Sequence, residues 1–149
     1  MIRKAKISDV PTLQGLINHF ANNDEMLPRS LNAIYEDIRD FLIIEEDGRI
    51  LGCCALHITW EDLAEVRSLA VDPSVQGKGY GRMLVQACLD DAKDMGVPKV
   101  FALTYVPGFF EKMGFSPVDK SALPHKIWSE CINCPKFPDC GEEAVAIEL

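Results

Sequence analysis

Long apolar runs and signal-peptide features are both missing from this sequence. No stretch reaches the about 18 apolar residues that a helix needs to cross a bilayer. The basic amino terminus, Met1–Lys6, runs straight into polar Ser8-Asp9 without the apolar block of a signal peptide. These absences predict a cytoplasmic protein that neither enters a membrane nor is secreted.

Basic residues are also few. Lys and Arg total 15 against 23 Asp and Glu, which gives a formal net charge of -8 and an isoelectric point near 4.8. Non-specific binding to nucleic acid or to an anionic membrane needs basic surface, so we expect neither as a partner. A small anionic ligand needs only a local basic pocket, so the binding of such a ligand remains a possibility.

The chain does contain enough apolar material for one core. Its 149 residues suit a single domain, and 48% hydrophobic with 26% charged residues argues against disorder. Apolar spacing and turn residues predict the order β, α, α, β, β, β, α, β, α, β in an α/β (α+β) fold. The predicted elements cover residues 2–6, 10–20, 31–38, 41–46, 49–59, 63–71, 79–95, 99–104, 107–113 and a strand from 114, and residues 144–149 are a candidate last strand.

The most informative segment is a glycine-rich stretch between a predicted strand and a predicted helix. It reads Gln76-Gly77-Lys78-Gly79-Tyr80-Gly81-Arg82. Alternating glycines allow a tight turn with outward N–H groups, and the helix that follows adds partial positive charge at its N-terminus. The pattern predicts a pyrophosphate cradle, with a plain strand-to-helix turn as the alternative. The spacing is not that of a Walker motif.

In its position, this loop resembles that of the GNAT acetyltransferases. Leu69–Pro73 followed by the loop fits the family's Q/R-x-x-G-x-G/A motif, and Phe109–Phe115 is similar to the family's late helix and turn. The resemblance extends over residues 2–118. It implies a mixed, mainly antiparallel sheet that is splayed around acetyl-CoA and has helices on both faces.

The resemblance also implies which residues contact acetyl-CoA as cosubstrate. The pantetheine arm is expected on the backbone of Leu69, Ala70 and Val71, where an N–H group polarises the thioester carbonyl. The late helix brings Phe110 to the cofactor side. The phosphate contacts are expected from Gln76, Gly77, Lys78, Gly79, Tyr80, Gly81 and Arg82.

Further segments look like the acetyltransferase domain of N-acetylglutamate synthases. They are Glu25–Ser30, Cys53–Leu56, Ala64–Val71 and Phe101–Thr104. The likeness implies acetyl transfer to the α-amino group of L-glutamate, the entry step of arginine biosynthesis. A dicarboxylate needs fixed cations, and Arg29 is able to bind a carboxylate bidentately, although a loop arginine alone is more often solvated. Arg67, Ser68 and Thr104 are the other substrate-side candidates.

Direct transfer needs a base for the ammonium proton and an acid for the departing thiolate. Glu65 matches the family's glutamate base; the alternative is an ordinary glutamate at a hairpin end. The family's acid is a tyrosine at the position of Phe110, so Tyr105 is the candidate acid. Thr104, Ser68 or water are the alternatives.

Two other functions stay open at this point. One is a GNAT enzyme that acetylates another small amine or a protein amino terminus. The other is an interaction module that binds CoA or a metal without catalysis, which the missing tyrosine and the cysteine-rich end suggest.

Three of the six cysteines are close together near the end of the chain. Cys131, Cys134 and Cys140, together with His125, have the residue types of a Cys₃His zinc site. Free thiols and a disulfide are the alternatives. We expect residues 1–127 to form the acetyltransferase domain and residues 128–149 to form a Cys-rich extension packed on it. The oligomeric state is open, with a homodimer as one candidate.

Overall fold

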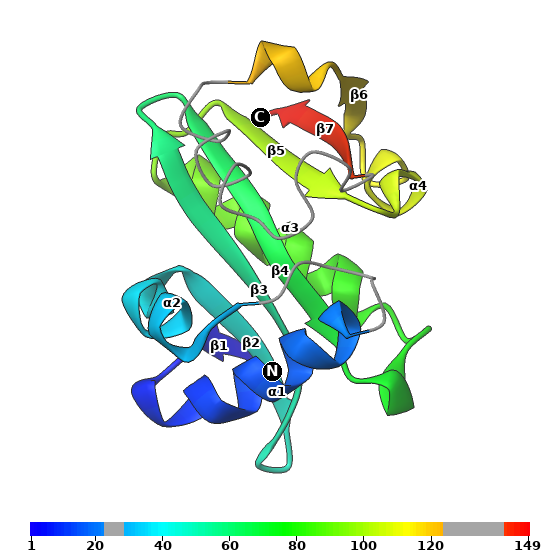
Figure 1. Ribbon diagram of the computed structural model, residues 1–149. Coiled ribbons are helices and arrows are strands. Elements are labelled where there is room, and N and C mark those ends of the chain that lie inside the picture. Colours follow the sequence, from blue (N-terminus) through cyan, green and yellow to red (C-terminus); the bar gives the residue numbers. More distant parts are fainter. Residues whose placement is uncertain (23–28, 124–141) are drawn as a thin grey trace.

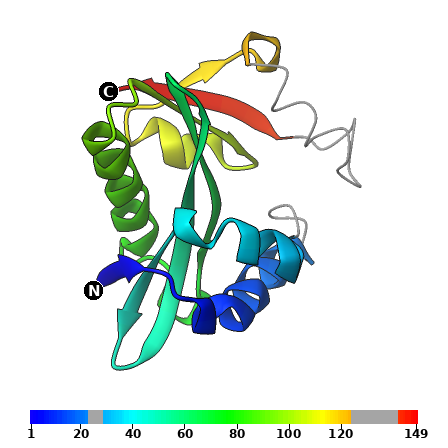
Figure 2. The ribbon, with the colours of Figure 1, turned by 90° about the vertical axis from the view of Figure 1, so that its left-hand side faces the viewer.

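The fold is a seven-stranded sheet with helices on both of its faces (Figures 1 and 2). The computed structural model describes residues 1–22, 29–123 and 142–149. The strands are β1 (Ile2–Lys4), β2 (Phe41–Glu46), β3 (Arg49–Trp60), β4 (Leu63–Val71), β5 (Lys99–Thr104), β6 (Ser116–Val118) and β7 (Glu143–Glu148). The helices are α1 (Val10–Ala21), α2 (Leu31–Glu36), α3 (Tyr80–Asp94) and α4 (Pro107–Glu111), and short 3-10 turns are η1 (Ile7–Asp9), η2 (Ile38–Asp40), η3 (Pro73–Val75) and η4 (Lys120–Ala122). This order of strands and α-helices agrees with the predicted one.

The strands are arranged in the order β1-β2-β3-β4-β5-β7-β6. Among the described strands, β4 and β5 form the parallel pair and every other pair is antiparallel. The predicted mixed, mainly antiparallel sheet is therefore confirmed. The parallel strands β4 and β5 pair over only two residues, and beyond these residues they separate.

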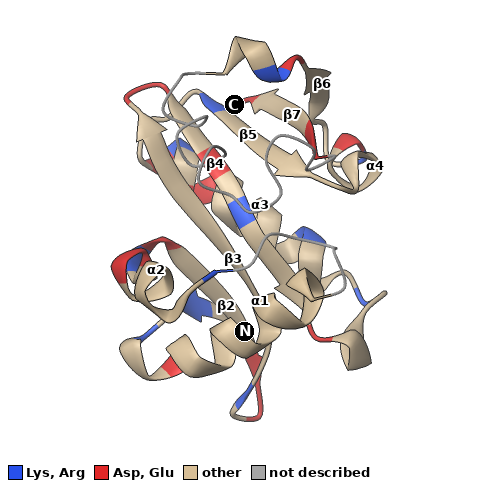
Figure 3. Ribbon diagram, in the orientation of Figure 1, with Lys and Arg blue, Asp and Glu red and all other residues tan. Residues whose placement is uncertain are grey.

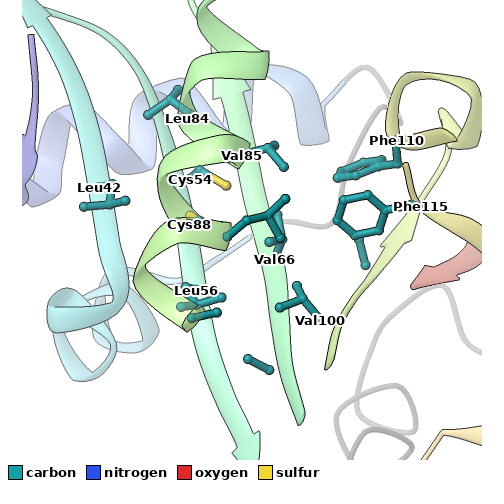
Figure 4. Packing of buried hydrophobic residues seen from close by; sticks show 14 of the residues in the cluster. Leu42, Cys54, Leu56, Val66, Leu84, Val85, Cys88, Val100, Phe110 and Phe115 are labelled. Atoms are coloured by element: carbon teal, nitrogen blue, oxygen red, sulfur yellow. The ribbon is translucent and has the colours of Figure 1, made fainter. Parts of the chain in front are cut away.

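The alternation of side chains along β3 divides the apolar core into two layers. Cys54 and Leu56 belong to the layer beneath α3, whereas Cys53 and Ala55 belong to the layer beneath α1 and α2. Figure 4 shows α3 packed on the first layer, and Figure 2 shows α1 and α2 on the opposite side of the sheet. Burial on both faces explains why the middle of β3 is apolar at every position.

Several predicted boundaries differ from the structure by one or two residues: β1 ends at Lys4, α2 at Glu36 and α4 at Glu111, each two residues before the predicted end. The strand expected from residue 114 begins at Ser116 instead. Gly114 has φ 102, and the backbone N–H of Phe115 donates to the carbonyl oxygen of Phe110 at 3.1 Å. These two residues therefore close the end of α4, and the chain becomes extended only after them.

The candidate last strand is present as β7 and is an inner strand of the sheet. It pairs with β5 from Thr104↔Glu143 to Lys99↔Glu148, and its other edge pairs with β6. Residues 124–141 lie outside the described residues, so the Cys-rich extension and the division after residue 127 stay predictions. No helix in the described part of the chain is long and apolar enough to cross a membrane.

Candidate active site

The sheet opens between β4 and β5. The two strands are in register only at Ala64↔Val100 and Glu65↔Phe101. Beyond these pairs β4 continues beside β3 and β5 continues beside β7, so the two strands diverge toward their carboxyl ends (Figure 1). In the described ranges no strand pairs with the edge of β4 that faces this opening. Such an edge is able to hydrogen-bond an extended ligand.

A β-bulge in β4 lies at the point where the strands separate. Ser68 and Leu69 together face the single residue Cys54 of β3. Ser68 has φ 57, in the left-handed region that residues other than glycine seldom adopt. The bulge separates the predicted base, Glu65, from residues 69–71, the segment expected along the cofactor.

The glycine-rich loop leads from β4 into α3. Gly77 and Gly79 have φ 83 and 84, and Gly79 is the N-cap of α3. A Cβ at either position would meet no atom within 4 Å, so the backbone conformation, and not a lack of space, favours glycine here. The side-chain amide of Gln76 donates to the carbonyl oxygen of Val71 at 3.2 Å and ties the loop to the end of β4.

The charges expected for a phosphate site accompany this loop. Lys78 and Arg82 are exposed at the N-terminus of the 15-residue helix α3. Tyr80 is half-buried and hydrogen-bonds the carboxylate of Glu46; desolvation and that carboxylate raise the pKa of the phenol. A Cβ on Gly81 would lie 3.5 Å from the ring of Phe109, so α3 and α4 approach closely at this turn. The N-terminal N–H groups and the two cations make this turn suitable for an anion.

The predicted base lies beside a predicted substrate arginine. Glu65 and Arg67 are two residues apart on β4 and therefore lie on the same face of the strand, and their side chains are 10% and 11% exposed. Nη1 of Arg67 is 3.6 Å from Oε1 of Glu65, and Nη2 of Arg67 is 2.9 Å from Oδ2 of Asp37. Figure 3 shows the acidic and basic positions together midway along β4.

Arg29 reaches the same carboxylate from the loop before α2. Its Nη2 is 2.5 Å from Oδ2 of Asp37, and its backbone N–H donates to Oδ1 of Asn18 at 3.4 Å. Nε of Arg29 is buried and makes no hydrogen bond to any described residue. Buried donors are normally paired, so Arg29 keeps a donor for a further acceptor. Two arginines that the sequence places on separate elements thus lie together.

The other candidates lie on the β5 side of the opening. Oγ1 of Thr104 accepts a hydrogen bond from the N–H of Val106 at 2.9 Å, which shapes the turn after β5. The hydroxyl oxygen of Tyr105 is buried. Phe110 is 4% exposed and packs edge-on against Phe109 and Phe115, so its ring belongs to the core. The candidate base and the candidate acid therefore come from opposite arms of the opening.

Three polar residues of this region were not expected as site residues. Asp37 follows α2, and Asp40 ends η2. Oδ2 of Asp40 lies 2.7 Å from Nδ1 of His57, and this hydrogen bond is the main reason that the pKa of His57 is raised above its usual value. His57 is also the register partner of Glu65 on the neighbouring strand. The alternation of side chains along β3 puts His57 on the same face of the sheet as Ala55, and this was the one signal in the sequence for its place near the site.

These three residues also bring ligand-type atoms within 4.8 Å of one another. Arg29 and Arg67 bind the carboxylate of Asp37, and Asp40 is hydrogen-bonded to His57. These contacts form an ion-pair network. The residues predicted to bind zinc lie outside the described residues: His125, Cys131, Cys134 and Cys140. Their metal binding stays a prediction.

The cysteines nearest the site are fully buried. Cys53 and Cys54 have no exposed surface, and Cys88 of α3 lies against Cys54 (Figure 4). Burial raises the pKa of Cys53 to about 12, while a hydrogen bond with Cys88, followed by burial, raises that of Cys54. A thiol that is not ionised is a poor nucleophile, as expected for residues with no catalytic part.

Known proteins share this architecture. Residues 10–115 match the Acetyltransferase (GNAT) family. An uncharacterized N-acetyltransferase of Chlorobaculum tepidum is 40% identical over 148 residues, which cover 99% of this chain and 96% of that protein. An amino-acid acetyltransferase of Mycobacterium tuberculosis is 34% identical over 133 residues, which cover 87% of this chain and 76% of that protein.

A solved structure agrees with the sequence relatives. The N-acetylglutamate synthase of Neisseria gonorrhoeae, complexed with coenzyme A and N-acetyl-glutamate, is 29% identical and has a TM-score of 0.92. The match covers all of this chain and 35% of that longer protein. With the splayed sheet, the bulge and the glycine-rich loop in place, the chain belongs to the GNAT family and is an N-acetyltransferase homologous to amino-acid acetyltransferases.

Proposed function

We propose that this enzyme transfers the acetyl group of acetyl-CoA to the α-amino group of an amino acid, with L-glutamate as the preferred acceptor and arginine biosynthesis as the setting. The observation that carries the proposal is the convergence of Arg29 and Arg67 on Asp37, with Arg67 beside Glu65. The guanidinium groups of Arg29 and Arg67 suit the two carboxylates of the acceptor, and the carboxylate of Glu65 suits the acceptor's ammonium group. The amino-acid acetyltransferase of Mycobacterium tuberculosis and the N-acetylglutamate synthase of Neisseria gonorrhoeae support this choice.

The opening between the strands fits acetyl-CoA, which supplies an acetyl group activated as a thioester. The edge of residues 69–71 is able to pair with the amide groups of the pantetheine arm. The loop of residues 76–82 is able to bind the pyrophosphate through backbone N–H groups, with Lys78 and Arg82 neutralising its charge.

The chain's own residues account for each proton movement. Glu65 accepts a proton from the acceptor's ammonium group, directly or through one water, and leaves an amine with a free lone pair. A backbone N–H of residues 69–71 polarises the thioester carbonyl while the N–C bond forms. Tyr105 gives its proton to sulfur as the C–S bond breaks and regains one from solvent. Glu65 passes this first proton to solvent, accepts the second proton of the nitrogen as the amide forms, and releases that one as well. Two protons thus leave the nitrogen and one is taken up for the thiol, so one proton is released per turnover.

A second candidate is transfer to another small amine. The acidic side chains of Asp37, Asp40 and Glu65 gather on one side of the opening and would attract a cation. The arginines that neutralise Asp37 favour the first proposal. A polyamine that outruns every dicarboxylate would reverse this preference.

The test is release of free CoA thiol from acetyl-CoA with each of the twenty amino acids and with a polyamine. We expect L-glutamate to react fastest. Glu65→Gln should lower kcat by about 10²–10⁴, the usual contribution of a positioned base. Arg29→Ala should raise KM for glutamate about 10- to 100-fold, since it removes a charge-assisted hydrogen bond.

The matched control is Arg39→Ala, because Arg39 is exposed on the neighbouring turn η2. It should leave KM for glutamate unchanged. The proposal fails if Glu65→Gln and Arg29→Ala both retain full glutamate turnover. Tight acetyl-CoA binding with no turnover of any amine would instead indicate an interaction module.

A further inference from the structure

Asp37 occupies a junction between the two arginines of the site. It is the C-cap of α2, and its side chain is 22% exposed. The single oxygen Oδ2 lies 2.5 Å from Nη2 of Arg29 and 2.9 Å from Nη2 of Arg67. Both contacts are charge-assisted hydrogen bonds, and the one from Arg67 has the usual length for such a bond. One carboxylate therefore fixes the position of guanidinium groups from a loop and from β4.

Arg67 is shared unequally between two carboxylates. Its Nη2 is at hydrogen-bond distance from Asp37, whereas its Nη1 is 3.6 Å from Oε1 of Glu65. Hydrogen bonds from N–H to oxygen are 2.7–3.2 Å long, so the contact with Glu65 is an ion pair without a full hydrogen bond. The short contact to Asp37 accounts for the direction in which the guanidinium is turned.

This division matters for a residue that must accept a proton. A guanidinium that closes on a carboxylate in a bidentate pair strongly favours the ionised form and lowers the proton affinity of that carboxylate. A base in that state accepts a proton from an ammonium group less readily. Glu65 thus depends on Arg67 remaining near it but not fully paired with it.

We propose that Asp37 is a positioning residue which, by binding Arg67, keeps the guanidinium from closing on Glu65 and so preserves the proton affinity of Glu65. The inference rests on the proposed role of Glu65 as the base. Asp37 acts on Glu65 through Arg67 and takes no part in the proton and acetyl transfers proposed above. Oδ2 of Asp37 also binds Arg29 and so fixes the second guanidinium group of the site.

Other charged groups face this junction from each neighbouring element. Arg29 comes from the loop before α2, Asp40 from η2, His57 from β3, and Glu65 with Arg67 from β4. Asp40 and His57 are paired with each other at 2.7 Å. Asp40 is therefore a carboxylate of the same neighbourhood that binds His57 instead of an arginine of the site, which makes it a suitable control for a general charge effect.

The experiment is the dependence of kcat on pH with acetyl-CoA and L-glutamate. Asp37→Asn should move the acid limb of the profile to lower pH by about one unit, because the released Arg67 pairs fully with Glu65. Asp37→Ser should give the same shift, and Asp37→Glu, which keeps a carboxylate, should restore most of the original profile. Thermal unfolding and acetyl-CoA binding confirm that each variant is folded.

Three outcomes would overturn the inference. In the first, the acid limb does not move in either Asp37→Asn or Asp37→Ser; the contact between Asp37 and Arg67 would then be merely structural. Asp40→Asn moves the limb as far as Asp37→Asn, which would make the effect one of general charge. Glu65→Gln keeps full activity, and in that case the proposed base itself is wrong.

Discussion

The thiol of Cys53 on β3 donates a hydrogen bond to the carbonyl oxygen of Ser68 on β4, at 3.4 Å. Ser68 is the bulge residue with φ 57, and Cys53 is fully buried. A bulge leaves backbone groups that the regular ladder does not pair, and buried groups of this kind need partners. The thiol supplies one and so supports the bend at which β4 leaves β5.

Substitutions at Ser68 should reveal the strain of this bulge. Ser68→Val should lower the free energy of unfolding by about 1–3 kcal/mol, because a β-branched residue is strained at positive φ. Ser68→Gly should change it by less than about 1 kcal/mol, since glycine adopts this conformation readily. Urea unfolding measures both. Equal stability of the two variants would show that the bulge is not strained, since valine normally suits a strand better than glycine does.

The local parts of this fold could be predicted from the sequence. The apolar character of residues 41–46 and 49–59 around Asp47-Gly48 predicts a hairpin, and the apolar stripe between Met83 and Met95 predicts α3. Each of these signals is contained in the residues that form the element. The resemblance to the GNAT family then gave the arrangement of the elements.

Features that depend on two distant segments could not be predicted. The bulge at Ser68 arises from how β4 pairs with β3, and serine carries no signal for positive φ. Asp37 resembles any solvated acid after a short helix, and only folding brings Arg29 and Arg67 to it. Arg29 and Arg67 were expected as substrate residues, but their shared carboxylate was not.

The pair of His57 and Asp40 should be visible in a titration. Since the hydrogen bond to Asp40 raises the pKa of His57, NMR of the imidazole should give a midpoint above 6.5. The charged pair stabilises the fold fully below the unfolded pKa, and this stability is lost as pH rises through the folded pKa. Asp40→Asn should lower the midpoint substantially.

Asp37→Asn should lower the midpoint of His57 less than Asp40→Asn does, because Asp37 acts on the imidazole only through space. A wild-type midpoint at or below 6.5 would contradict the hydrogen bond between Asp40 and His57. So would equal effects of the two substitutions.

The ion pair of Arg3 and Asp9 should make the fold sensitive to acid. Asp9 is buried and accepts hydrogen bonds from Arg3 at 2.9 and 3.2 Å and from the N–H of Lys6 at 2.7 Å. The bond with Arg3 is the main reason that the pKa of Asp9 lies below its usual value. Its stabilising effect is therefore present above the unfolded pKa and is lost as pH falls through the folded pKa.

Asp9→Asn should lower the free energy of unfolding by about 2 kcal/mol at pH 7, the usual size for hydrogen bonds to a charged group, and by less near pH 3. Guanidinium chloride unfolding at both pH values measures the difference. Asp90→Asn, on the exposed face of α3, is the control and should change stability little at either pH. A loss for Asp9→Asn that is equal at pH 7 and pH 3 would rule out the ion pair as its cause.

Two glycine-to-alanine substitutions should have opposite effects on stability. A Cβ on Gly52 of β3 would lie 3.0 Å from the carbonyl oxygen of Ala70 and 3.1 Å from Cδ1 of Leu84. The carbonyl is backbone in the middle of the sheet and cannot move cheaply, so Gly52→Ala should cost about 1–3 kcal/mol. Gly15 lies within α1 with nothing within 4 Å of an added Cβ, so Gly15→Ala should gain about 0.5–1 kcal/mol.

The same pair of variants links packing to the proposed cofactor edge. Because Ala70 belongs to the segment of β4 expected along acetyl-CoA, displacement of its carbonyl in Gly52→Ala should also raise KM for acetyl-CoA, whereas Gly15→Ala should leave that KM unchanged. Urea unfolding and acetyl-CoA titration of the thiol-release assay measure the two effects on the same samples. If Gly52→Ala loses stability but keeps the wild-type KM for acetyl-CoA, the backbone at Ala70 does not position the cofactor.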